Sequence, residues 1–311
     1  MPAPHIPIMV AEILDGLRVA ELPAAQWIDG TLGAGGHSHA ILSTRADSTL
    51  MGFDLDPAAL QIAAGRLAEF GSRAILQHAS YEQMGELAAA WSGQVDGILL
   101  DLGISSMQVD NAERGFSFRQ DAPLDMRFDP TSGKPTAADL VNNLPQDELA
   151  DIIKTYGEDN YSRPIAKALI AARPIHTTRQ LAEVIEQQAK GARDKIHPAT
   201  RTFQALRIVV NDELGAVERV LPIALDLLKP GGRIAVITFH SLEDRIVKQF
   251  FKAAATDCIC PPHQPICTCG ANNATIDLIT RKPLTAADTE IAANPRARSA
   301  KLRIVAKLAK P

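Results

Sequence analysis

A glycine-rich turn between a strand and a helix places the strongest constraint on the fold of this chain. The run from Trp27 to Ser38 reads Trp-Ile-Asp-Gly-Thr-Leu-Gly-Ala-Gly-Gly-His-Ser, and its apolar start predicts a buried strand end. A second apolar segment, Leu50 to Asp54, ends in a carboxylate. In an open α/β sheet, glycines let backbone N–H groups approach a nucleotide-like ligand, and an acid ending the next strand holds ribose hydroxyls. The pair predicts a site for an adenosine-like group.

Strand-like and helix-like segments alternate along the first part of the chain, which favours a parallel sheet covered on both faces. The predicted strands are Gln26–Asp29, Thr49–Asp54, Ala74–His78, Gly97–Leu102 and, after an interruption, Arg233–Phe239. Segments between them, such as Pro57–Phe70 and Ala216–Leu228, are predicted to be helical. The fold class is therefore α/β.

The interruption indicates an inserted subdomain. Residues 111–134 are turn-rich, and the pattern is then helical to about Asn211 with no intervening strand. Several consecutive helices do not fit inside a doubly wound sheet. We predict that residues 1–110 and 206–311 form one sheet domain that is split in sequence, and that residues 111–205 form an inserted, mainly helical subdomain.

Composition is that of an ordinary globular protein. The 311 residues are 46% hydrophobic and 22% charged, and no run approaches the roughly 18 apolar residues of a membrane helix. Glu12 and Asp15 interrupt the segment where a signal peptide needs an unbroken apolar run, so a cytoplasmic protein is expected. The net charge of −4 does not indicate indiscriminate nucleic-acid binding.

The charge distribution along the chain is more informative than its sum. From Arg281 to the end there are eight basic residues against Asp288 and Glu290. Two interpretations stay open on charge alone, a solvated tail and an edge that contacts phosphates.

Three features favour a sulfonium methyl donor over a nicotinamide. The turn Gly33–Ser38 departs from the dinucleotide fingerprint, whose last position is Gly or Ala. Asp101 ends a buried strand and precedes the hydroxyls of Ser105 and Ser106, which predicts polar groups at the ligand-binding edge of the sheet. The turn Lys229–Gly232 enters a late strand, as in the methyltransferase version of this sheet. A nicotinamide-dependent oxidoreductase stays the alternative.

Seven motifs in one order resemble the bacterial 16S ribosomal RNA cytosine-N4 methyltransferase family over nearly the whole chain. They are Asp29–Ser38, Leu99–Gln108, Glu113–Phe118, Pro123–Arg127, His197–Ala205, Phe239–Arg245 and Asn294–Ser299. The resemblance implies a Rossmann-like class I methyltransferase sheet whose inserted helical subdomain helps to recognise the substrate. It implies methyl transfer from S-adenosylmethionine to the exocyclic N4 amine of a cytosine at the decoding centre, within the small ribosomal subunit. A non-catalytic assembly factor that binds the donor is a further alternative, and the oligomeric state, including a homodimer, stays open.

The resemblance also implies a set of cofactor-binding residues. They are Gly33, Gly35, Gly36, His37, Asp54, Tyr81, Asp101 and Gln108. In this reading the glycines and His37 line the methionine and ribose side of the donor. Asp54 holds the ribose hydroxyls, and Tyr81 stacks on adenine.

Methyl transfer to a cytosine amine requires alignment and a hydrogen-bond acceptor, because the amine lone pair is delocalised into the ring. The predicted catalytic residues are Asp101, Ser105 and His240, with the Ser106 hydroxyl as a further acceptor. Related amino-methyltransferases carry Asn/Asp-Pro-Pro-aromatic where this chain has Asp101-Leu102-Gly103-Ile104, so the usual stacking aromatic is missing. Phe116, Phe118 or His240 are candidates to replace it, and core packing is the alternative for each Phe.

All four cysteines lie in one short segment. They are Cys258, Cys260, Cys267 and Cys269, in two Cys-x-Cys pairs. In a cytoplasmic protein such clustering indicates metal more often than a disulfide. Four thiolates, with His263 as a substitute ligand, predict a structural zinc site, and reduced free thiols are the alternative.

Overall fold

The computed structural model describes residues 7–188, 197–261, 264 and 266–309, which form two compact units. One unit comprises the chain up to Gly103 and from Leu214 onward, and the other comprises Ile104–Glu213. The boundaries therefore fall outside the predicted 111–205 on both sides. The reason is packing: Ile104 and the apolar face of the last inserted helix contribute to the core of the helical unit.

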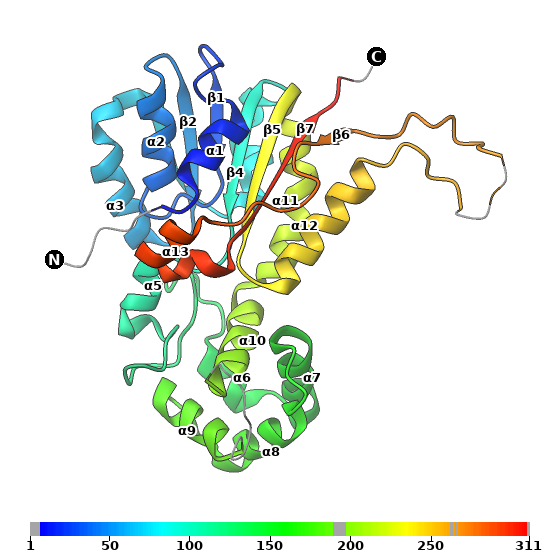
Figure 1. Ribbon diagram of the computed structural model, residues 1–311. Helices are drawn as coiled ribbons and strands as arrows, with labels where there is room; N and C mark the ends of the chain where they lie inside the picture. The colour runs from blue at the N-terminus through cyan, green and yellow to red at the C-terminus, as the bar shows by residue number, and fades with distance from the viewer. Residues whose placement is uncertain (1–6, 189–196, 262–263, 265, 310–311) are drawn as a thin grey trace. The chain divides into compact units, whose positions relative to one another are not determined.

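The first unit is built on a seven-stranded sheet with the order β3-β2-β1-β4-β5-β7-β6 (Figure 1). Its strands are β1 Gln26–Asp29, β2 Thr49–Asp54, β3 Ala74–His78, β4 Val95–Asp101, β5 Leu228–Thr238, β6 Ile276–Leu278 and β7 Lys301–Lys307. Strands β1 to β5 pair in parallel, and β7 and β6 add antiparallel pairs. This Rossmann-like α/β sheet confirms the predicted fold class. Because β1 lies between β2 and β4, the strand order reverses there, which is where such sheets bind ligands.

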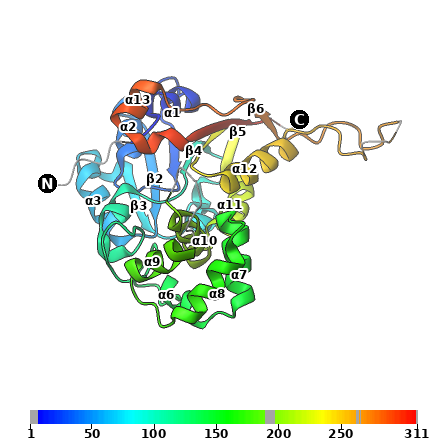
Figure 2. The same ribbon diagram turned by 60° about the horizontal axis from the view of Figure 1, so that its bottom comes forward.

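Helices cover both faces of the sheet (Figures 1 and 2). One layer contains α1 Val10–Leu17, α2 Gly36–Thr44 and α3 Pro57–Leu67, and the other contains α4 Met84–Leu87, α11 Glu213–Leu227 and α12 Ser241–Ala254. Side chains alternate between the layers, so Trp27 and Leu99 pack in the first core whereas Ile28 and Ile98 pack in the second. Short 3₁₀ helices are η1 Ala68–Arg73, η2 Tyr81–Gln83, η3 Ala89–Trp91, η4 Ala112–Arg114 and η5 Pro295–Ser299.

The basic C-terminal segment is part of the sheet and is not a solvated tail. After α13 Asp288–Ala293, strand β7 inserts between β5 and β6. Arg303 is 8% exposed and donates two hydrogen bonds to Asp244, at 2.8 and 3.2 Å. The solvated-tail interpretation is therefore wrong for this strand, because Arg303 is buried and paired inside the fold. The phosphate-contacting edge stays a prediction.

The helical unit has a core of its own. Its helices are α5 Ser106–Asp110, α6 Ala137–Asn143, α7 Gln146–Gly157, α8 Ser162–Ala172, α9 Thr178–Gln188 and α10 Ala199–Asn211. The turn-rich stretch is tied to α10 by Asn211, whose side chain accepts from the Phe128 N–H at 2.7 Å and donates to the Met126 carbonyl at 2.8 Å. No helix among the described residues of either unit combines the length and apolar character that a membrane span requires.

Candidate active site

The glycine turn after β1 is fastened to both neighbouring strands. The N–H of Gly30 donates to the Leu99 carbonyl at 2.9 Å, and the N–H of Leu32 donates to the Phe53 carbonyl at 2.9 Å. Gly33 has φ +51°, and a Cβ there would meet nothing closer than the Thr31 carbonyl at 3.9 Å. Gly33 is therefore required for its left-handed backbone and leaves one side of the turn open.

Gly35 and Gly36 have a different role, which is close packing. Gly35 has φ +74°, and a Cβ at this position would lie 3.3 Å from atoms of Ala63 and Leu67 on α3. At Gly36 a Cβ would lie 3.0 Å from Pro7. Both glycines therefore let α2 begin immediately after the turn, with the N–H groups of its first turn at the ligand-binding edge of the sheet.

Asp54 ends β2 and is oriented by the glycine turn. Its Oδ2 accepts from the Gly33 N–H at 2.7 Å, and its Oδ1 accepts from the Asp56 N–H at 2.8 Å. Burial raises the pKa of Asp54 to about 6, although both backbone hydrogen bonds act against the shift. Each carboxylate oxygen keeps a second lone pair, so the side chain is suited to accept hydrogen bonds from a ribose diol.

Three further side chains form a buried polar network beneath the turn that sequence reasoning did not identify. Asp29 is 1% exposed and accepts from the Ser38 hydroxyl at 2.6 Å and from the Thr31 N–H at 3.1 Å. Burial raises the pKa of Asp29, and the Ser38 hydrogen bond lowers it in part. The Thr31 hydroxyl in turn accepts from the Asp101 N–H at 2.6 Å. The sequence signal that could have identified Asp29 is its position at the end of an apolar strand, directly before a glycine.

His37 and Asp101 meet above this network. His37 Nε2 lies 3.5 Å from Asp101 Oδ2, and the His37 side chain is only 8% exposed. Among the described residues, neither His37 ring nitrogen nor Asp101 Oδ1 has a hydrogen-bond partner, although all three atoms are buried. Buried polar atoms are normally satisfied, so these orphaned atoms indicate a place for a polar ligand.

Tyr81 begins η2 directly after β3 and belongs to the same edge of the sheet. A Cβ built on Gly30 would lie only 3.2 Å from the Cβ of Tyr81, so the tyrosine backbone lies against the glycine turn. The side chain is partly buried. The position fits the predicted contact with a flat base, and the local signal is Ser80, which caps η2 with Gln83 and fixes the direction of the chain.

His240 has a capping role in the structure. It precedes α12, where its Nδ1 accepts from the Glu243 N–H at 3.4 Å and its Nε2 lies 3.0 Å from Glu243 Oε1. Glu243 is 1% exposed and also accepts from the Phe239 N–H at 2.8 Å. Gly103, just beyond β4, lies beside this group, since a Cβ there would be 3.5 Å from the Phe239 ring. His240 therefore stands next to the Asp101 strand, with its imidazole against Glu243.

Ser105 and Gln108 belong to the helical unit, where they form a capping box on α5. The Ser105 hydroxyl accepts from the Gln108 N–H at 3.2 Å, and the Gln108 side-chain oxygen accepts from the Ser105 N–H at 3.1 Å. Gln108 is buried. One lone pair of the Ser105 hydroxyl is thus used to begin a helix, which weakens its case as a proton acceptor. The Ser106 side chain lies outside the described part of the structure.

The phenylalanines weighed as stacking groups take part in aromatic packing within the helical unit. Phe116 stacks on Phe128 with ring centroids 5.8 Å apart. Phe118 stacks on His197 at 4.3 Å and meets Phe203 edge-on at 5.0 Å. These contacts favour the core-packing alternative for both.

The four cysteines come together elsewhere in the first unit, in the segment between α12 and β6. His263, considered as a substitute ligand, lies outside the described residues. The remaining predicted residues divide between the units: the glycines, His37, Asp54, Tyr81, Asp101 and His240 lie in the sheet unit, whereas Ser105 and Gln108 lie in the helical unit.

The sheet edge fits a nucleoside-type methyl donor. Asp54 offers the diol acceptor, the open side of Gly33 admits close approach, and the orphaned atoms of His37 and Asp101 offer polar contacts in a buried place. Donors, acceptors and an aromatic side chain therefore converge at the switch point of the sheet.

Comparison with known proteins identifies the family. The profile described as the MraW methylase family matches residues 2–308. A relative from Geobacter sulfurreducens, named ribosomal RNA small subunit methyltransferase H, is 53% identical over 98% of this chain and 99% of its own length. Relatives with the same name from Syntrophotalea carbinolica and Heliobacterium modesticaldum are 51% and 48% identical, each with 98% of both chains aligned. The chain therefore belongs to the MraW methylase family, which confirms the predicted methyltransferase over the nicotinamide-dependent oxidoreductase.

Proposed function

We propose that this protein transfers a methyl group from S-adenosylmethionine to the exocyclic N4 amine of a cytosine at the decoding centre of 16S ribosomal RNA. The curated relatives are named for methylation of small-subunit ribosomal RNA, which supports the RNA class. The resemblance of the seven motifs supports the cytosine N4 target. The single observation that carries the chemistry is the orphaned, buried Oδ1 of Asp101 at the end of β4.

Four features of the sheet unit would hold the donor, which when bound supplies an electrophilic methyl group. Asp54 accepts hydrogen bonds from the ribose hydroxyls, and Tyr81 stacks on the adenine. The open side of the turn at Gly33 allows the donor to approach the protein backbone closely. The first turn of α2, with His37, faces the methionine end of the donor. Gly35 and Gly36 act indirectly, because they let α2 begin where the turn ends.

Asp101 would then orient and activate the amine. An acceptor that takes a hydrogen bond from the amine draws its nitrogen lone pair out of conjugation with the ring, which increases nucleophilicity. As the nitrogen–carbon bond forms and the carbon–sulfur bond breaks, the nitrogen loses a proton to Asp101 or through it to water. His37, 3.5 Å from Asp101 Oδ2, orients the carboxylate, and the Thr31 hydroxyl, which accepts from the Asp101 N–H, holds the backbone of Asp101.

We further propose that the helical unit and exposed basic side chains contact the RNA. Arg303 is used in the fold, but Arg281, Lys282 and Arg298 are exposed. A few exposed cations on an acidic protein suit a large, structured substrate that is recognised by shape better than indiscriminate RNA binding.

The test is methyl transfer by an Asp101→Asn variant, with Asp277→Asn on the exposed face of β6 as the matched control. Small subunits that lack the modification are incubated with tritiated donor, and the RNA is digested for nucleoside mass spectrometry and for mapping. We expect N4-methylcytidine at the decoding centre with wild type and control, and a loss of about 100-fold or more in rate with Asp101→Asn.

Three outcomes would contradict the proposal. Label in 5-methylcytidine or methyladenosine would refute the target atom, and label only in free cytidine or duplex DNA would refute the substrate. An Asp101→Asn variant that binds S-adenosylhomocysteine and methylates at the wild-type rate would refute the role of Asp101.

A further inference from the structure

The cysteines lie on an arm that leaves the sheet unit between α12 and β6; we call residues 257–273 the arm (Figure 1). Backbone and side-chain hydrogen bonds close its base. The Thr275 N–H donates to the Ala254 carbonyl at 2.8 Å, and the Asn273 side chain donates to the Asp257 carbonyl at 2.8 Å. The two ends of the arm are thus held together at its base by a few hydrogen bonds.

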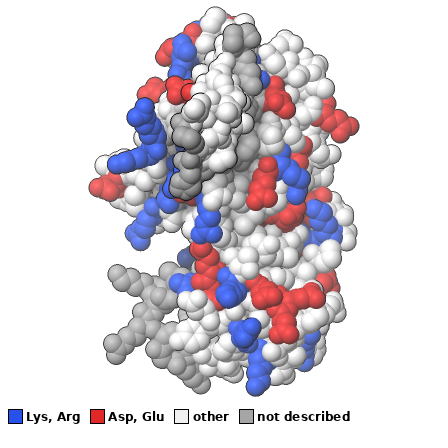
Figure 3. All heavy atoms as spheres, turned by 90° about the vertical axis from the view of Figure 1, so that its right-hand side faces the viewer, with Lys and Arg blue, Asp and Glu red and all other residues white. Residues whose placement is uncertain are grey.

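The described residues of the arm form no apolar core, and Asp257 at its base is its only Asp, Glu, Lys or Arg residue. No described residue from Lys252 to Thr275 is buried, and Ile259 and Ile266 are 65% and 73% exposed. The sequence from Cys258 to Ile276 contains no Lys, Arg, Asp or Glu, and in Figure 3, which looks onto this side, its described atoms are uncoloured. Neither hydrophobic burial nor ion pairing can therefore order the arm, and small segments of this kind need a cross-link or a metal.

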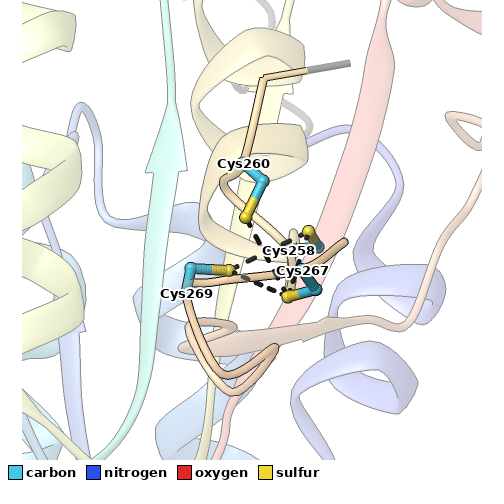
Figure 4. A group of neighbouring side chains, drawn as sticks. All are labelled: Cys258, Cys260, Cys267 and Cys269. Atoms are coloured by element: carbon cyan, nitrogen blue, oxygen red, sulfur yellow. Dashed lines mark hydrogen bonds between the residues drawn. The ribbon is translucent and has the colours of Figure 1, made fainter. Parts of the chain in front are cut away.

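Four sulfur atoms converge inside the arm and form what we call the cysteine cluster, Cys258, Cys260, Cys267 and Cys269 (Figure 4). The Sγ atom of Cys267 lies 3.8, 3.9 and 3.6 Å from those of Cys258, Cys260 and Cys269. The Sγ atoms of Cys269 and Cys258 are 3.9 Å apart, and all four lie within 4.8 Å of one another.

These separations match a tetrahedral metal site and not a disulfide. A disulfide brings two sulfurs to about 2.05 Å. Zinc–thiolate bonds of about 2.3 Å place the corners of a regular tetrahedron about 3.8 Å apart. Four of the six sulfur–sulfur separations in the cluster lie between 3.6 and 3.9 Å, close to that edge length.

The backbone around the cluster supports thiolates. The Thr268 N–H donates to Cys260 Sγ at 3.3 Å. Gly270 and Ala271 follow with φ values of +79° and +49°, and a Cβ on Gly270 would meet no atom within 4 Å, so the glycine serves the turn itself. This left-handed turn reverses the chain directly after Cys269 and brings the second Cys-x-Cys pair against the first.

We propose that the cysteine cluster binds one zinc ion, which closes the arm and takes no part in methyl transfer. Thiolates are soft ligands, and a closed set of four sulfurs with tetrahedral geometry selects zinc among the common divalent ions and leaves no open position for catalysis. The ion replaces the core that the arm lacks, because metal binding then supplies the free energy that orders the segment.

Metal content tests the proposal directly. Full-length protein purified without added metal, and without a metal-affinity step, is analysed by mass spectrometry of its elements. We expect one zinc per chain in wild type and at least about a tenfold lower content in a Cys258→Ser, Cys267→Ser double variant. Ile259→Ser is the matched control: it introduces the same exposed residue into the arm, keeps all four sulfurs and should keep the zinc.

A second measurement tests the site in wild-type protein, so that neither loss of the ion during purification nor misfolding of the variant can decide the result. Wild-type protein is stripped under reducing, oxygen-free conditions and titrated with Co²⁺, whose tetrahedral thiolate complexes absorb strongly in the visible. We expect saturation at one equivalent, displacement by Zn²⁺, and slower cleavage of the arm by protease after loading. Stripped protein that gives no such spectrum, or isolated protein that carries either disulfides or four freely reactive thiols without metal, would overturn the proposal.

Discussion

Binding of the methyl donor should weaken sharply below pH 6, because the carboxyl that we propose as the acceptor for the ribose hydroxyls titrates there. Burial raises the pKa of Asp54 to about 6. Lowering the pH through 6 protonates the carboxyl of the free protein, and a protonated Asp54 loses the charge that strengthens its hydrogen bonds to hydroxyls. If only the ionised form binds, the apparent Kd rises by the factor 1 + 10^(pKa − pH).

The factor is large enough to measure. At pH 8 it is about 1, at pH 5.5 about 4 and at pH 5 about 11, whereas an aspartate with an ordinary pKa of about 3.9 would change the Kd by less than about 10% over this range. The fold should persist at pH 5 as far as Asp54 is concerned. Because its pKa is raised in the folded state, its contribution to stability falls as the pH rises from about 4 to about 6 and is greatest on the acid side.

Isothermal titration with S-adenosylhomocysteine from pH 5 to pH 8 at constant ionic strength provides the assay, with circular dichroism to verify the fold at each pH. The control is Asp54→Asn, which retains the shape of the side chain. Losing a charged acceptor costs about 1.5–3 kcal/mol, so this variant should bind about 10- to 150-fold more weakly, with a Kd that no longer depends on pH. Its amide must also face the N–H of either Gly33 or Asp56, so its thermal unfolding is recorded alongside. A wild-type Kd that is the same at pH 5 and pH 8, or an Asp54→Asn variant that keeps the pH dependence, would refute the reasoning.

Three further predictions concern stability and are measured by urea unfolding. Gly33→Ala should cost about 1–2 kcal/mol, because its Cβ has room but φ is +51°, and a loss above about 4 kcal/mol would reveal a clash that the geometry does not show. Arg207→Met should cost about 3–5 kcal/mol, because it leaves the carboxylate of Glu213, 6% exposed, without its two guanidinium hydrogen bonds; an unchanged midpoint would contradict this. Asp244→Asn should cost about 1.5–3 kcal/mol at pH 7. Burial raises the pKa of Asp244, but Arg303 and Lys301 outweigh it and hold that pKa below its usual value. The difference from wild type should therefore begin to shrink as the pH falls below about 4 and be lost once the pH is below the depressed pKa; a difference that is constant from pH 7 down to the acid-unfolding limit would disprove the assignment.

Local signals in the sequence were sufficient to predict the strands and the turn that form the proposed donor site. Strands β1, β2 and β3 begin and end at the predicted residues, because each is a short apolar run bounded by turn residues. The glycine turn follows β1, and Asp54 ends β2. Because neighbouring parallel strands end at the same edge of the sheet, the turn and the carboxylate meet there. The sheet and the methyltransferase family followed from these features and from the motifs.

Contacts between distant residues required the tertiary structure. Strand β7 was hidden because Lys301 and Arg303 make it look like a basic tail, and only the pairing of Arg303 with Asp244, 59 residues earlier, makes its burial possible. His240 is a strand-end histidine in sequence, and its capping of α12 through Glu243, three residues later, is a local signal that the sequence reading missed because His is an uncommon N-cap. Sequence spacing predicted the cysteine cluster as metal ligands but could not bring four sulfurs together. That depends on how two turns and the base of the arm close, and a linear pattern contains no information on such closure distances.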